Sequence, residues 1–441
     1  MQRFVLEQSS QEIHTSHAGL ALLGRAIRLS GLEAAVDELP LLHGIAHRDV
    51  VKSYLGLLAL GKSDFEAVSN MREDPFFRQA LDIERVPSAA RLRLRLDQHA
   101  EALMEQVDVA LVEFLQTAQV PITPLRTGHM SLDLDVFPLD NSGTKKEGVG
   151  RTYAGYDGYA PIGGYLGEEG WCLACELRPG TQHSQREFLY VLERVVPRAR
   201  ALTALPLLMR LDSGHDALEN RIFCTEQDVD FIIKWNPRKE SPEQWLRYAE
   251  AAGHWVVWEQ PRPGKRVVTF TLYVESRYRG RTYTFRRVMR VTERTIDAQG
   301  QALLVPEMGI EGWWTSLDLA DAEIIRLYEE HATSEQFHSE FKTDLDIERL
   351  PSGKFATNDL VLAMAALTYN ILRYIGLTGL LGPDAPVRHE AKRRRIRTVM
   401  QELMYLAARL IHHGRQCYLR FGRHCPGFPA FGRVYQALVP G

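Results

Sequence analysis

The sequence lacks several features that would commit it to an extracellular or membrane class. Only five of its 441 residues are Cys, an odd number with no regular spacing, so a disulfide framework is not expected. No stretch approaches twenty uninterrupted apolar residues, and the opening MQRFVLEQSSQEIH lacks the apolar core of a signal peptide. We therefore expect no membrane insertion and no secretion, and a cytoplasmic location.

A strong net charge is also missing. The formal net charge is −3, which gives no global field for nucleic acid. Basic residues are nevertheless bunched in two places, first in Arg91, Arg93 and Arg95, and then in Lys392, Arg393, Arg394 and Arg395. Such clusters predict local contacts to DNA, with a solvated basic helix face as the alternative.

Periodicity divides the chain into helical and strand-rich regions. Apolar residues recur at helical spacing over residues 17–118, whereas HMSLDLDVFPL alternates in steps of two and predicts a strand. This pattern indicates an α/β protein with helical terminal regions and an antiparallel β insertion. The predicted regions are a helical DNA-binding region (residues 1–125), a first core segment (126–235), a β-rich insertion (236–318), a second core segment (319–380) and a basic helical region (381–441).

Three acidic positions fit one edge of a mixed sheet. Asp133 and Asp135 lie on one face of the first predicted strand, and Asp212 follows the strand LPLLMRL directly, before a Ser-Gly turn. A cluster of carboxylates repels itself unless a hard cation is bound. Two Mg²⁺ or Mn²⁺ ions about 4 Å apart would suit phosphodiester cleavage or transfer.

The stretch LYEEHATSEQFHSEFKTDL, residues 327–345, supplies a further carboxylate. At 100° per residue, Glu335 shares one helix face with Tyr328, His331 and Lys342, whereas Glu329, Glu330 and Glu340 point elsewhere. Tyr, His and Lys side chains can hold phosphate oxygens. A solvated polar face would look similar, so the neighbouring acids carry the argument for Glu335.

These motifs, in this order, resemble bacterial insertion-sequence transposases of the DDE type. In the resembling group, the Glu helix has Tyr, Arg, Glu and Lys in the register of Tyr328, His331, Glu335 and Lys342, so His331 departs from the pattern. LMRLDSGHD matches the second Asp, Asp212. The first Asp is Asp135, with Asp133 in reserve, although Phe137 stands where the group has Thr.

The resemblance implies an RNase H-like core and a defined chemistry. Asp135, Asp212 and Glu335 would hold two Mg²⁺ or Mn²⁺ ions, water would cut at the transposon end, and the freed 3′-OH would attack target DNA. Tyr328, His331 and Lys342 would contact phosphates beside the scissile bond. The expected partners are double-stranded DNA and a second copy of the chain assembled on it.

Two other functions stay open. One is a metal-dependent nuclease or resolvase on the same core that does not transfer strands. The other is a DNA-binding protein that is derived from a transposase and no longer catalyses. The departures from the family pattern at Phe137 and His331 favour this alternative.

Several other motifs are weaker candidates for function. Cys172 and Cys175 form C-x-x-C in an apparent strand, which would place them on opposite faces. Trp313 and Trp314 could stack on an extruded base, although strand alternation puts one of them in the core. The possible zinc ligands near the C-terminus lack a recognised spacing; they are His412, His413, Cys417, His424 and Cys425.

Overall fold

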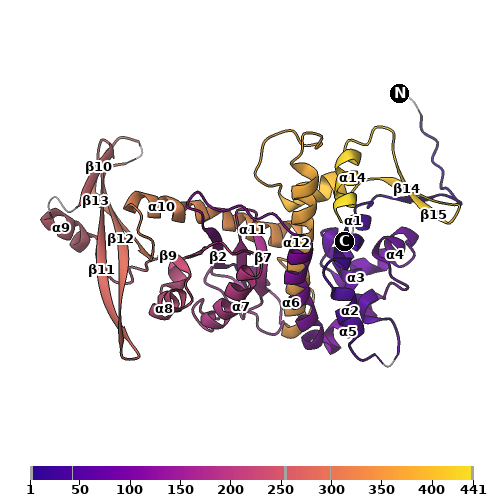
Figure 1. Cartoon of the computed structure of the whole chain (residues 1–441), viewed down its shortest axis with the longest axis horizontal. Helices are drawn as coiled ribbons and strands as arrows, with labels where there is room; N and C mark the ends of the chain where they lie inside the picture. The colour runs from indigo at the N-terminus through magenta and orange to yellow at the C-terminus, as the bar shows by residue number, and fades with distance from the viewer. Residues whose placement is uncertain (1–2, 42, 253–255, 298, 439–441) are drawn as a thin grey trace.

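The computed structural model describes residues 3–41, 43–252, 256–297 and 299–438, apart from the side chains of residues 332–334. The molecule is elongated, with a helical lobe at one end and the long antiparallel strands at the other (Figure 1). The core strands and their helices lie between them. Helices α1 (Leu20–Arg28) and α14 (Phe428–Ala437) both belong to the helical lobe. Segments from the two ends of the chain therefore build this lobe together.

The core of the molecule is a mixed sheet. Its strands are β2 (Met130–Val136), β6 (Ile162–Leu166), β7 (Trp171–Glu176), β8 (Leu207–Leu211) and β9 (Asp230–Lys234). They lie in the order β7-β6-β2-β8-β9; β2 and β8 are parallel, β8 and β9 are parallel, and β6 is antiparallel to both its neighbours. This order with one reversed strand is that of the RNase H fold, and it confirms the predicted fold class.

The predicted β insertion extends the core sheet. Strands β10 (Val257–Arg262), β11 (Lys265–Tyr278), β12 (Arg281–Ile296) and β13 (Ala302–Thr315) form an antiparallel meander, preceded by α9 (Pro242–Ala252). Strand β13 pairs antiparallel with β9, which gives one nine-stranded sheet. The insertion is therefore joined to the core strands by the backbone hydrogen bonds between β13 and β9.

Helix α12 (Phe355–Leu380) is the central support of the fold. It packs on β7 and on α6 (Ala100–Thr117), and its side chains are almost all buried. By length and composition it could cross a membrane, but 94% of its most apolar window is buried inside the protein. Burial on this scale is that of a core helix, because a globular domain covers its most apolar helix with other elements.

The remaining elements belong to the helical lobe or surround the core sheet. In the helical lobe they are α2 (Leu32–Asp37), α3 (His47–Ala59), α4 (Pro75–Leu81), α5 (Ala89–Gln98) and α13 (Ile396–Val399). Around the core they are α7 (Phe188–Arg200), α8 (Leu218–Glu226), α10 (Asp321–Glu329), α11 (Ser334–Ser339), β3 (Leu139–Asp140), β4 (Gly150–Arg151) and β5 (Asp157–Tyr159).

The terminal regions are less purely helical than predicted. Strands β14 (Ala408–His413) and β15 (Gln416–Phe421) form a hairpin, and β1 (Ile13–Thr15) pairs with β14. The prediction of a helical region over residues 381–441 was therefore wrong for residues 408–421. The hairpin turn is formed by Gly414 and Arg415, both with positive φ, which a continuing helix cannot adopt.

Candidate active site

Two parallel strands bring Asp135 and Asp212 to the same edge of the core sheet. Asp135 is near the carboxyl end of β2, and Asp212 directly follows the neighbouring strand β8. Both side chains line a pocket of about 380 Å³ that Glu335 of α11 also lines. Residues 77 and 123 positions apart in the chain therefore line one pocket at the end of the parallel strands.

The electrostatics of this pocket are those of crowded carboxylates. Burial, with the charges of Asp212 and Glu335, raises the pKa of Asp135 to about 7, against a smaller opposing effect of His331 and the Val136 N–H. Burial also raises the pKa of Asp212, although the Gly214 N–H donates to this carboxylate at 3.1 Å. A bound cation would relieve this repulsion.

Asp133, the reserve candidate, has a different environment. Its carboxylate accepts two hydrogen bonds of 2.7 Å from Arg210, and its Oδ1 lies 3.1 Å from Nδ1 of His331. Burial would raise the pKa of Asp133, but the charges of Arg210 and His331 outweigh it and lower the pKa to about 2. This carboxylate is therefore paired with Arg210 inside the protein, whereas Asp135 lines the pocket with Asp212 and Glu335.

The segment carrying Glu335 is not the single α-helix that the helical phase assumed. It consists of α10, a 3-10 turn (Glu330–Thr333), α11 and a π-turn (Glu340–Asp344). Tyr328, His331 and Glu335 still line the same pocket, whereas Lys342 lies outside its described lining. Lys342 lies within the π-turn, so the phase of a regular α-helix does not apply to it.

The other Glu residues of this segment separate into two kinds. Glu340 is buried and forms an ion pair with Arg373, so its role is structural. Glu329 lines the acidic pocket, contrary to the prediction that it points away, and lies 3.0 Å from Arg290. The 3-10 turn between Glu329 and Glu335 rotates the two residues relative to the ideal helix.

The residues present suit a hard divalent cation. Asp135, Asp212 and Glu335 supply carboxylate oxygens, and these are the protein ligands of Mg²⁺ and Mn²⁺. Within the stretches of chain that the structure describes, no three Asp, Glu, His or Cys side chains are close enough to form a complete metal site. Water and substrate phosphate oxygens would supply the other ligands, as is usual for Mg²⁺.

The opposite wall of the pocket was not predicted. Lys234 of β9 and Arg290 of β12 both bind Glu311 of β13, at 3.1 and 2.6 Å, and the Arg290 guanidinium lies 5.0 Å from the ring centre of Trp313. Arg290 and Glu311 are direct cross-strand partners. The register between β12 and β13 brings them together, and the sequence gives no local signal for that register.

The predicted basic clusters are divided between surface and interior. Arg91 and Arg93 are exposed. Arg95, by contrast, is buried on the face of α5 that also carries Leu92 and Leu96, and it donates to the carbonyl of Ile45. Arg95 therefore serves packing in the free chain, which corrects its predicted placement on a DNA-facing surface.

The second cluster shows the same division. Lys392 and Arg395 are exposed, Arg393 is half-buried, and Arg394 is buried. Arg394 donates to the carbonyls of Leu380 and His389, so it fixes the loop after α12 and is not available to DNA in the free chain.

The weaker candidates are mostly structural. Cys172 and Cys175 are both buried in β7. Trp313 is a buried wall of the pocket, and Trp314 packs under Arg221, whose guanidinium lies 3.9 Å from the ring centre. Among the described residues, the C-terminal His and Cys side chains form no metal-binding group.

A sequence profile of the family described as "Transposase DDE domain group 1" matches residues 6–440, almost the whole chain. The chain belongs to the DDE transposase family. This confirms the resemblance found in the motifs. No curated protein matches the chain.

Among solved structures, this protein matches a chain of a complex described as a piggyBac transposase synaptic complex with hairpin DNA, determined by cryo-EM. The identity is 10%, the TM-score is 0.41, and the match covers 90% of this chain and 82% of that chain. The likeness is too slight to support a conclusion about this protein, whose fold class rests on its own strand order.

Proposed function

We propose that this transposase cleaves DNA at the ends of its element and joins the freed 3′-OH to target DNA, with Asp135, Asp212 and Glu335 as the catalytic acids. The observation that carries the proposal is that these three carboxylates line one pocket, where burial and the charges of Asp212 and Glu335 raise the pKa of Asp135. When bound, two Mg²⁺ or Mn²⁺ ions would activate the attacking oxygen and stabilise the leaving one.

The surrounding side chains would hold the DNA backbone. The Tyr328 hydroxyl and the cations Lys234 and Arg290 line the same pocket as the acids, where phosphate oxygens would lie. The phosphate contacts predicted for His331 and Lys342 stay predictions, because His331 is buried beside Asp133 and Lys342 is half-buried.

The DNA-bound assembly is proposed to contain two copies of the chain acting in the bacterial cytoplasm. Two transposon ends must be cut and joined in one complex, and the three proposed acids of each copy line a single pocket. Exposed Arg91 and Arg93 are proposed to add backbone contacts away from that pocket.

Cleavage of a labelled duplex that carries the element's own end tests the proposal. With Mg²⁺, we expect wild type to cut, and Asp212→Asn and Glu335→Gln to lose about 10³-fold or more in rate. Asp318→Asn and Glu101→Gln, which change exposed carboxylates in the same way, should cut like wild type. A Glu335→Gln variant that cuts normally would refute the assignment of this acid.

The products separate the alternatives. Joined molecules in which the element's 3′ end is linked to target DNA support transposition. If purified wild type cuts the ends but never joins them to the target DNA that is present, the protein is a nuclease or resolvase without strand transfer. Binding without cutting in either Mg²⁺ or Mn²⁺ indicates a non-catalytic DNA-binding protein.

A further inference from the structure

A groove of about 530 Å³ lies beside the helix that carries Glu335. Its charged and polar lining includes Arg126, Glu168, Arg210, Gln336, Lys392 and Arg393. Glu329 lines both this groove and the acidic pocket, so the two hollows adjoin. A DNA strand with its scissile phosphate at the acids would have its neighbouring phosphates within reach of such a groove.

Most cations of the groove already have acidic partners. Lys392 lies 3.0 Å from Glu168, and Arg126 lies 2.5 Å from Glu323. Arg210 binds Asp133 in the buried pair described above. A phosphate would have to compete with these carboxylates for each of the three cations.

Arg393 is different, because its partners are neutral. It donates to Oε1 of Gln336 at 2.7 Å and to the carbonyl of Glu168 at 3.3 Å, and its guanidinium lies 4.5 Å from the ring centre of Phe337. Among the described residues, no carboxylate lies within ion-pair distance of Arg393. Burial and the nearby charge of Arg373 lower the pKa of Arg393 against smaller opposing effects that include the charges of Glu340 and Glu168, so this half-buried charge is only partly compensated.

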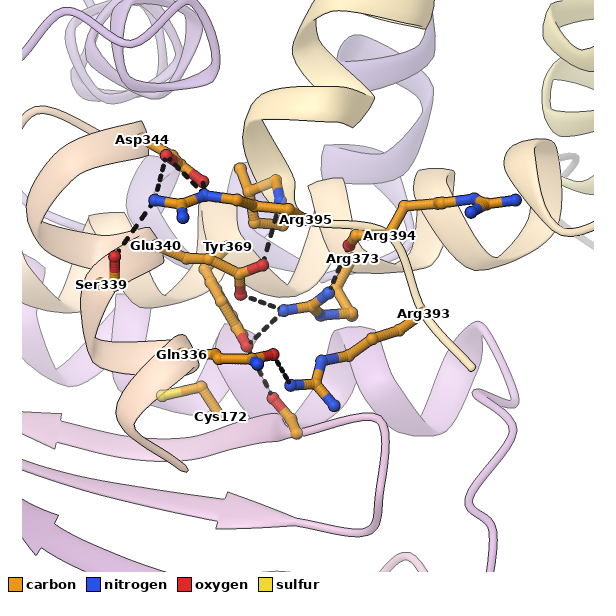
Figure 2. Close-up of polar contacts among 12 residues, drawn as sticks. Cys172, Gln336, Ser339, Glu340, Asp344, Tyr369, Arg373, Arg393, Arg394 and Arg395 are labelled. Carbon is orange, nitrogen blue, oxygen red and sulfur yellow. Dashed lines mark hydrogen bonds and ion pairs between the residues drawn. The ribbon is translucent and has the colours of Figure 1, made fainter. Parts of the chain in front are cut away.

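The contact with Gln336 connects Arg393 to the catalytic segment. Figure 2 shows Arg393 reaching Gln336, the residue that follows Glu335 in the six-residue helix α11. The far end of the segment is fixed separately, since Arg395 binds Asp344 at 2.9 Å in the π-turn (Figure 2). Arg393 therefore contacts the segment from the groove side, at the residue next to the proposed catalytic acid.

Buried contacts hold the same π-turn from behind. Glu340 forms an ion pair with Arg373 (Figure 2). It also accepts a hydrogen bond of 3.1 Å from the N–H of Ile396. The base of the catalytic segment is thereby tied to the C-terminal chain independently of Arg393. Loss of the Arg393 contact should change the setting of α11 without releasing the whole segment.

We propose that the groove binds a backbone phosphate of DNA through Arg393, and that Arg393 in turn fixes Glu335 through Gln336. The proposal rests on the proposed function of the acidic pocket and deepens it. The guanidinium can donate to a phosphate oxygen with one nitrogen and keep Gln336 on another, which the single ammonium of a Lys cannot do in the same geometry. Arg393 would thus be a positioning residue that responds to DNA.

Binding without metal tests the phosphate contact. Fluorescence anisotropy of a labelled duplex carrying one element end, measured over a range of salt, should show about tenfold weaker binding for Arg393→Ala. The slope of log K against log salt should fall by about 0.9, the value for one lost phosphate contact. Lys392→Ala, the neighbouring cation that has a carboxylate partner, should weaken binding less than about threefold.

Single-turnover cleavage tests the link to Glu335. Gln336→Met keeps the size of the side chain but removes the acceptor for Arg393. We expect this variant to bind the duplex like wild type and to cut it about tenfold more slowly at saturating DNA. Arg393→Lys should retain most of the salt slope but show the same slow cutting, because the charge remains and the two-armed geometry does not.

The outcomes separate this inference from the proposed function. If folded Arg393→Ala, checked by thermal melting, binds with unchanged affinity and salt slope, the phosphate contact is refuted. If Gln336→Met cuts at the wild-type rate, the positioning role is refuted. Failure of wild type to cut refutes the proposed function, while the metal-free binding measurement still decides the contact of Arg393 with DNA.

Discussion

The middle of strand β2 and its carboxyl end offer a direct comparison, because each carries one Asp and the two lie on the same face. Asp133 is closed in by Arg210 and His331, and its pKa is lowered to about 2. Asp135 opens to a pocket with Asp212, and its pKa is raised to about 7. The same residue type is thus an internal ion-pair partner at one position and a candidate metal ligand at the other.

The difference comes from where the neighbouring strand ends. Asp133 lies opposite Arg210 of β8, and Leu134 lies opposite Leu211, the last residue of that strand. Beyond this point β8 supplies Asp212 instead of a cation. The comparison teaches that the edge of a parallel sheet, more than the identity of a side chain, decides which carboxylate is left for chemistry.

The largest expected effect is that of neutralising Asp135, the carboxylate at the end of β2. Asp135→Asn should reduce the rate of end cleavage about 10³-fold or more, because it removes a ligand of the catalytic ions. Its thermal midpoint without metal should not fall, since the substitution removes a repelled charge. Cleavage assays and calorimetry on the same preparation check both statements, and a variant that loses stability as well as activity would break the comparison.

The second effect concerns Asp133, the buried carboxylate in the middle of β2. Asp133→Asn should lower the free energy of unfolding by about 3 kcal/mol, because it leaves Arg210 buried without its counter-charge. Urea denaturation followed by circular dichroism measures this change. Equal stability of Asp133→Asn and wild type would show that the pair does not hold the core.

A third, smaller effect should follow when both charges are removed. The double variant Asp133→Leu with Arg210→Met should lie within about 2 kcal/mol of wild type, so it should be more stable than Asp133→Asn alone. The remaining loss is expected because the carbonyl of Leu327 no longer receives its hydrogen bond from Arg210. A double variant less stable than the single one would argue for a role of Arg210 beyond the pair.

The smallest effect is the response to pH and magnesium. Without metal, the raised pKa of Asp135 means that its contribution to stability is complete below pH 4 and is lost as pH rises through about 7. Mg²⁺ binds the ionised form, so at about ten times its Kd it should add about 1.4 kcal/mol at pH 8 and much less at pH 5. Differential scanning calorimetry of wild type and Asp135→Asn measures this gain, which the variant should lack.

The sequence predicted the candidate acids more accurately than their surroundings. Alternation in HMSLDLDVFPL placed Asp133 and Asp135 on one face, and the apolar run before Asp212 predicted its position at a strand end. Phe337 and Phe341 are buried, in keeping with an apolar anchor for the Glu335 segment. The assumption of one regular helix failed, because the 3-10 turn and the π-turn depend on packing against the core and the C-terminal chain.

Charge was the least reliable local signal. Arg93 and Arg95 are equally basic in the sequence, but Arg93 is exposed and Arg95 is buried within the helical lobe. Arg395 and Arg394 differ in the same way. A run of basic residues predicts positive charge near a surface, whereas the partners of each guanidinium depend on carbonyls and carboxylates that distant segments supply.

The sequence by itself determined the kind of protein, because strand alternation, helical periodicity and the order of acidic motifs are local patterns that survive without knowledge of the fold. Only the tertiary structure showed that Asp133 pairs with Arg210 while Asp135 lines the pocket, and only it showed Arg393 bound to Gln336. Both outcomes depend on contacts between residues far apart in the chain, 77 positions for Asp133 and Arg210 and 57 for Arg393 and Gln336. Strand register and long-range ion pairing set such contacts, and neither is written in the neighbouring residues.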